Sequence, residues 1–122
     1  MQPGPQAGDT GCTALTARLP GRLLGQSRVQ LDVAGAAAWG SPRIVLRCGV
    51  ESPGPTSDPC LSVDGIDWLF IDRKSTLLFL SYGRRPAVEL SVPSSYGREQ
   101  APGALSDLTT AVSAIPASRH CT

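Results

Sequence analysis

Residues 67–92, with the sequence DWLFIDRKSTLLFLSYGRRPAVELSV, decide the fold because three strand-like segments follow one another with only short turns between them. The segments are 67–72, 76–82 and 87–92, and in the last of them Val88, Leu90 and Val92 fall on one face. Turn-forming residues separate them at 74–75 and 83–86. Strands joined by such short connections pair antiparallel. This stretch therefore predicts an antiparallel meander.

Two further segments upstream extend the expected sheet. Residues 28–33 alternate, with valine or leucine at every second position, which predicts a half-buried strand. Residues 44–46 are apolar at successive positions and open a strand through Val50, a pattern typical of a central strand. Residues 34–42 predict a loop or short turn, and 51–59, with three prolines, a loop. The sheet is expected to have about five strands.

Helical patterns lie at both ends of the chain. Residues 10–19 predict a short helix capped by Thr10. Near the other end, Leu105, Leu108, Val112 and Ile115 are spaced by three, four and three residues, which predicts one helix ending before Pro116. The expected fold class is thus α+β, with the N- and C-terminal helices packed on one face of the antiparallel sheet. Residues 1–9 predict a disordered tether, and 10–122 a single domain.

Composition narrows the classes of protein. The chain has 122 residues, of which 41% are hydrophobic and 17% charged, so it is one domain with enough apolar side chains for a core. A net charge of +1 is too balanced to steer the chain to nucleic acid or to an anionic membrane. No apolar run approaches the roughly 20 residues of a membrane span.

Four cysteines, at positions 12, 48, 60 and 121, predict two disulfides and an oxidising compartment. Three pairings are possible. Cys48–Cys60 is favoured because it closes the loop rich in proline and glycine, and Cys12–Cys121 because it joins the two ends of the domain. No pair has the short spacing of a zinc or redox site, so no metal is expected. The expected location is extracytoplasmic, with a leader or anchor that this sequence does not include.

Catalytic patterns are weak. His120 is the single histidine and stands in the C-terminal tail, a poor place for a general base. No nucleophile elbow, phosphate loop or dinucleotide fingerprint occurs, so no catalytic residue and no cofactor are expected. Whether the protein is an enzyme stays open at this stage, with binding favoured over catalysis.

Arginine and aromatic residues provide the candidate binding surface. Guanidinium groups bind carboxylates or phosphates in bidentate fashion, and tryptophan faces hold cations or sugar rings. Since aromatic residues are only 5% of the chain, a core role is favoured for both tryptophans over a role in binding. Arg47, within the central strand, is expected to pair with Asp67 or Glu89. The candidate residues are Trp39, Arg43, Arg47, Asp67, Trp68, Tyr82, Arg84 and Arg85.

Four separate motifs, at residues 36–42, 44–50, 63–69 and 88–96, carry a resemblance to a known family. Together they resemble the actinobacterial family called domain of unknown function 3515, over roughly residues 12–116. Members of that family look like exported proteins with an N-terminal membrane segment or a lipoprotein leader. The resemblance implies a cell-envelope domain that meets the membrane only through such an anchor. It implies no catalytic residue.

The favoured function is therefore a non-enzymatic, extracytoplasmic module that binds an envelope protein or a cell-wall component. One alternative is a small ligand-binding or catalytic domain acting on cell-wall precursors, for which a pocket lined by Arg47, Asp67 and Trp68 is expected. A second alternative is a structural subunit that pairs through a sheet edge, formed by 29–33 or by 87–92. The oligomeric state stays open.

Overall fold

The computed structural model describes residues 2–121; Met1 and Thr122, the outer ends of the expected tether and domain, lie outside them. The chain is an α+β fold with two disulfides, which confirms the expected class. The expectation of about five strands is wrong, because the described residues form eight. The strands are β1 (Arg22–Leu23), β2 (Gln26–Val29), β3 (Ala36–Trp39), β4 (Ile44–Val50), β5 (Cys60–Val63), β6 (Ile66–Asp72), β7 (Thr76–Ser81) and β8 (Ala87–Pro93). The helices are α1 (Thr10–Thr16), η1 (Ser94–Tyr96), α2 (Gly103–Asp107) and α3 (Thr109–Val112).

All eight strands form one antiparallel sheet in the order β1-β2-β3-β4-β8-β7-β6-β5. The last four strands are a meander, and so are the first four. The two meanders join where β8 returns to pair with β4 at the centre of the sheet. The suggestion that 29–33 or 87–92 forms an edge is wrong, since of 29–33 only Val29 belongs to a strand and β8 is an inner strand. The edges of the sheet are β1 and β5.

Strand β3 lies within the loop or short turn expected at 34–42, and β5 was not expected at all. All four residues of β3 are buried, so it lacks the alternation of polar and apolar residues that marks a half-buried strand. β5 has only four residues and begins directly after the proline-rich loop. The strand expected at 28–33 is shifted, because β2 starts at Gln26 and ends at Val29.

The helices are shorter than expected. The carboxylate of Asp9, rather than Thr10, caps α1 and accepts a hydrogen bond of 2.8 Å from the Gly11 N–H. The single C-terminal helix is broken at Leu108 into α2 and α3. The predicted apolar stripe survives this break, since Leu105, Leu108, Val112 and Ile115 all belong to the core.

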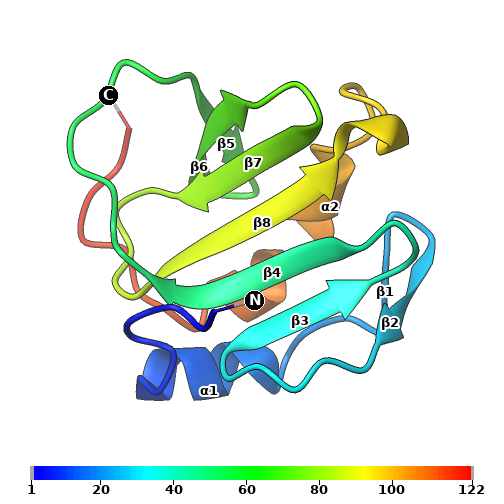
Figure 1. Cartoon of the computed structure of the whole chain (residues 1–122). Coiled ribbons are helices and arrows are strands. Elements are labelled where there is room, and N and C mark those ends of the chain that lie inside the picture. The colour runs from blue at the N-terminus through cyan, green and yellow to red at the C-terminus, as the bar shows by residue number, and fades with distance from the viewer. Residues whose placement is uncertain (1, 122) are drawn as a thin grey trace.

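The three α-helices pack on one face of the sheet, and Figure 1 shows the sheet from the other, helix-free side. Alternating residues of the central strands explain the arrangement. Ile44, Leu46 and Cys48 of β4 point into the core with residues of α1, α2 and α3. Val45 and Arg47 point to the helix-free face and are half-buried.

The disulfides are Cys12–Cys48 and Cys60–Cys121, so the favoured pairing of Cys48 with Cys60 and of Cys12 with Cys121 is wrong. The favoured pairing fails because Cys48 and Cys60 lie on opposite faces of the sheet. Cys48 lies on the core side of β4, where α1 brings Cys12 to a Cα–Cα distance of 5.6 Å. Cys60 lies on the opposite face of the edge strand β5, where the C-terminal tail passes at a Cα–Cα distance of 6.5 Å. Among the described residues no cysteine is free.

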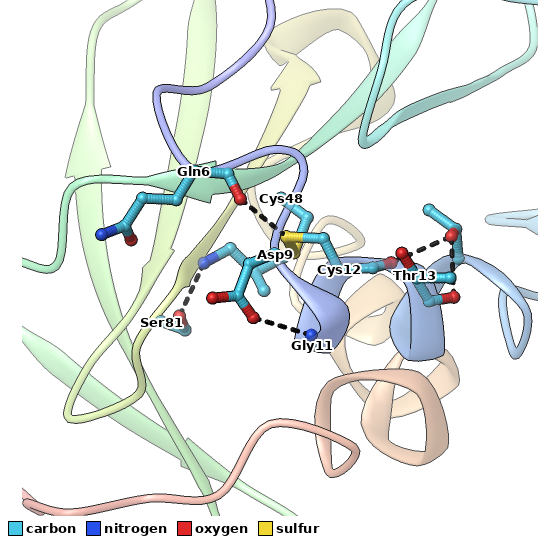
Figure 2. Close-up of a disulfide and its surroundings, with 9 residues drawn as sticks. Gln6, Asp9, Gly11, Cys12, Thr13, Cys48 and Ser81 are labelled. Carbon is cyan, nitrogen blue, oxygen red and sulfur yellow. Dashed lines mark hydrogen bonds between the residues drawn. A yellow bond between two sulfur atoms is a disulfide. The ribbon is translucent and has the colours of Figure 1, made fainter.

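The N-terminal segment folds against β4, in place of the disordered tether expected for 1–9. The Gln6 N–H donates to the Gly49 carbonyl at 2.8 Å, and the Asp9 N–H donates to the Gln6 carbonyl at 3.0 Å. Figure 2 shows the Gln6 carbonyl above the buried Cys12–Cys48 disulfide, 3.8 Å from the Cys12 sulfur. This approach is a contact rather than a hydrogen bond, because a disulfide sulfur carries no proton. Residues 2–9 are thus part of the domain.

Candidate functional site

A groove of about 560 Å³ lies on the helix-free face of the sheet. Its walls come from the central strands β4 and β8, from β7, and from the turn between β6 and β7. It is lined by Val45, Arg47, Arg73, Ser75, Thr76, Leu78, Glu89 and Ser91. Two cations, one anion and three hydroxyl groups therefore surround a floor that is partly aliphatic.

An ion pair closes one end of the groove. Arg47 and Glu89 are register partners on β4 and β8, and the Nε of Arg47 lies 3.2 Å from a carboxylate oxygen of Glu89. Both side chains are partly exposed, at 28% and 21%. Arg47 also donates to the Gln2 carbonyl at 3.1 Å. Glu89 is one of the two partners that the sequence analysis expected for Arg47. Their pairing leaves this end of the groove electrically balanced.

The floor of the groove is a row of residues that the strand register aligns across the sheet. Val45 of β4 is opposite Ser91 of β8, and Ser91 is opposite Leu78 of β7. Val45 and Ser91 are half-buried and Leu78 is nearly buried. A ligand in the groove would meet two aliphatic side chains with one hydroxyl between them.

Arg73 at the other end carries an unbalanced charge. It is exposed in the β6–β7 turn and forms no ion pair with any residue in 2–121. Its acidic neighbour Asp72 is already engaged, because Arg98 binds the Asp72 carboxylate at 2.7 Å and 3.1 Å. The backbone N–H of Lys74 donates to the same carboxylate at 2.8 Å. The groove therefore has one balanced end and one cationic end.

We expect Arg98→Gln to raise the pKa of the Asp72 carboxyl towards its ordinary value of 3.8. The side-chain hydrogen bond from Arg98 is the main cause that lowers this pKa, followed by the backbone hydrogen bond from Lys74. Since the folded pKa is lowered, the stabilising contribution is present above the unfolded pKa and is lost as the pH falls through the folded pKa. An NMR titration that follows the side-chain carboxyl carbon of Asp72 measures this pKa. Arg18→Gln, which removes an exposed charge elsewhere, should leave the pKa unchanged, and an unchanged pKa in Arg98→Gln would contradict the pairing.

A second cluster forms where the C-terminal tail meets β6. Asp67 accepts a hydrogen bond of 2.9 Å from the Cys121 N–H, and the Nδ1 of His120 lies 3.4 Å from the same carboxylate oxygen. The side chain of His120 is 67% exposed. Asp67 also lies close to the sulfurs of Cys60 and Cys121, but these are bonded to each other and cannot ligate a metal. These contacts hold the C-terminal tail against β6.

Arg84 and Tyr82 both lie next to the C-terminal tail. Arg84 is 8% exposed and donates to the Ile115 carbonyl, while its own backbone forms an isolated bridge with Ala117. Burial lowers the pKa of the Arg84 guanidinium, and the charge of Asp67 partly offsets this. Tyr82 lines a shallow groove of about 460 Å³ beside the exposed disulfide. Arg84 therefore has a structural role beneath the tail.

Both tryptophans are in the core and not on the candidate surface. Trp39 and Trp68 are 0% exposed, so neither can stack on a ligand at the surface. The Trp39 indole N–H donates to the Pro20 carbonyl at 3.0 Å. Both tryptophans therefore take the core role that the low aromatic content favoured, and neither belongs to the candidate binding surface.

The other arginine candidates are dispersed. Arg43 is exposed in the turn before β4. Arg85 lines a separate hollow of about 320 Å³ with Gln6, Glu51 and Ser52. Arg47 lies on the helix-free face, far along the sheet from the tail that covers Asp67. Within the described part of the chain, the structure thus forms no pocket from Arg47, Asp67 and Trp68.

Several residues of the groove were missed by the sequence analysis: Val45, Arg73, Ser75, Thr76, Leu78 and Ser91. A signal for some of them was present. Once one face of a strand is assigned to the core, the residues at intervening positions must share the other face. Listing those positions for β4, β7 and β8 finds Val45, Leu78 and Ser91. Arg73 and Ser75 lie in a turn and have no such periodic signal.

Comparison with known proteins gives one match. A family model described as "Protein of unknown function (DUF3515)" matches residues 1–120. No curated protein and no solved structure matches the chain.

Proposed function

The chain belongs to the DUF3515 family, whose description assigns no function, and from that premise we propose that it is an extracytoplasmic, non-enzymatic domain that binds a protein partner in the cell envelope. The observation that carries the proposal is the groove on the helix-free face of the sheet. An antiparallel sheet with helices on one side must expose its other side to solvent or to a partner.

The side chains of this face favour a partner over solvent. A solvated sheet face normally carries charged or polar residues at alternate positions. Here Val45 and Leu80 are half-buried, and Leu78 lies two residues before Leu80 on β7. Leu80 is opposite Glu89 of the Arg47–Glu89 pair. An aliphatic patch with charges at its rim is the usual composition of a protein-binding surface. Its carboxylate is already paired, which suits binding better than acid–base catalysis.

The disulfides support the proposed extracytoplasmic location. Both pairs of cysteines are bonded, and disulfides persist in oxidising compartments outside the cytoplasm. In residues 2–121, the helices are too short and too polar to cross a bilayer.

Site-specific photo-crosslinking in cells of the source organism tests the proposal. A photoreactive amino acid replaces Ser91 in the groove or, as a matched control, the exposed Thr110 on the helix side. We expect a discrete adduct from position 91 that purified unmodified domain competes away, and no such adduct from position 110.

Equal labelling from both positions, or none from position 91, would refute the groove as the binding surface. A cytoplasmic location is tested separately by alkylating free thiols at the moment of lysis, without prior reduction. Four alkylated cysteines in freshly lysed, unreduced cells would contradict the extracytoplasmic proposal.

A further inference from the structure

We propose that the groove takes an extended peptide segment of its partner, in which an apolar side chain is followed two residues later by a carboxylate. This inference rests on the proposed function and names the chemistry of the ligand. The apolar side chain would pack on Val45 and Leu78, and the carboxylate would bind Arg73.

Charge complementarity selects the carboxylate. Arg73 lines the groove without a counterion among the residues that the structure describes, because Arg98 and Lys74 occupy the neighbouring Asp72. A guanidinium binds a carboxylate through two parallel N–H donors. At the other end, Glu89 already neutralises Arg47, so a second carboxylate would be repelled there. The groove accordingly takes one acidic side chain, at the Arg73 end.

The strand register gives the length and spacing of the ligand. Arg47 and Thr76 lie on opposite sides of the Val45–Ser91–Leu78 row and are two strands apart. With about 4.8 Å between strands and about 3.3 Å per residue, the groove is about 16 Å long, which matches about five extended residues. In an extended chain, side chains two residues apart point the same way and are about 6.6 Å apart. That spacing lets one side chain reach the floor and the next reach Arg73.

Backbone hydrogen bonding distinguishes this mode from edge addition. Strands β4, β8 and β7 lie inside the sheet, and their backbone groups pair with one another. A ligand on this face therefore gains its affinity from side chains, and the hydroxyls of Ser75, Thr76 and Ser91 are available to hydrogen-bond its backbone.

Fluorescence anisotropy with two labelled peptides tests the inference. One probe has the repeat valine-threonine-glutamate-threonine, and its partner has glutamine in place of glutamate. We expect the glutamate peptide to bind about tenfold more tightly than the glutamine peptide, which is the size of one partly exposed charge-assisted contact. Arg73→Gln should remove this preference and leave the affinity for the glutamine peptide unchanged.

Two control variants separate specific from general effects. Arg18→Gln removes the same charge from the end of α1 and should leave the tenfold preference intact. Val45→Thr, similar in shape but polar, should weaken both peptides equally because it alters only the floor. Equal binding of the two peptides to the unmodified domain, or loss of the preference in Arg18→Gln, would overturn the inference. If that happens while position 91 still crosslinks in cells, the proposed function stands and only the ligand chemistry is wrong.

Discussion

Mild reduction is expected to open the two disulfides in sequence, Cys60–Cys121 first and Cys12–Cys48 only when the domain unfolds. Cys60 is exposed and Cys121 half-buried, so a small dithiol can reach that bond directly. Cys12 and Cys48 are 1% and 0% exposed. Attack on the buried bond needs an opening of the core. If that opening costs about 5 kcal/mol, it slows the reaction by about three to four orders of magnitude.

Burial, and not loop length, decides this order. The two bonds span 36 and 61 residues. The chain-entropy model gives both about 4 kcal/mol of stabilisation, with a difference of only about half a kcal/mol. That difference is too small to order the two reductions. The accessibility of the sulfur atoms is therefore the larger effect.

Timed alkylation after addition of dithiothreitol, followed by peptide mass mapping, measures the two rates. The Cys60→Ala/Cys121→Ala double variant serves as the control, since it should show the slow phase alone. Simultaneous opening of both bonds would mean that the core around α1 and β4 is loosely packed. Early modification of Cys12 would contradict the buried position of this disulfide.

Local signals in the sequence were sufficient for three adjacent strands of the sheet. In the β6–β7–β8 meander, apolar strand segments are joined by turns of few residues, so each pairing is set by neighbours in the sequence. β3 gave no such signal. Its residues Ala36–Trp39 are buried on both faces, and a strand without a polar face cannot be distinguished from an apolar loop by periodicity.

Non-local features could not be predicted in the same way. The pairing of β4 with β8 joins residues that are about 40 positions apart, such as Arg47 and Glu89. The disulfide pairing follows from this topology, because it determines which cysteine faces the helices. With Cys48 on the core face and Cys60 on the other, only the three-dimensional arrangement excludes the Cys48–Cys60 bond.

The candidate site was predictable only where it lies on strands. Arg47 and Glu89 stand at polar positions of expected strands, so their pairing could be anticipated. Arg73 lies in a turn, where nothing in the sequence indicates which way a side chain points. Residue type alone left two roles open for Trp39 and Trp68, because an indole serves a ligand site and a core equally well; the low aromatic content favoured the core, where both lie.

Gly49→Ala is expected to lower the free energy of unfolding by about 3 kcal/mol and to detach residues 2–9 from the sheet. Gly49 forms the bulge between Cys48 and Val50, with a φ of 95° that disfavours any side chain. A Cβ there would overlap the backbone of Gln6 and Ala7, lying 2.7 Å from the Ala7 Cα. The overlap involves backbone atoms, so no side-chain rotation can relieve it.

Gly65→Ala separates the cost of a side chain at positive φ from the cost of overlap with a neighbouring backbone. Gly65 has a similar φ of 83°, but a Cβ there would have no neighbour within 4 Å. This control should therefore cost only the conformational term, about 1 kcal/mol. Thermal unfolding gives the two stabilities, and limited proteolysis should cut within residues 2–9 in Gly49→Ala alone. Equal stability losses would mean that the N-terminal segment contributes nothing to the fold. A larger loss in Gly49→Ala would mean that residues 2–9 stabilise the fold through their contact with β4. The same segment borders the groove, because the Arg47 guanidinium donates a hydrogen bond to the Gln2 carbonyl.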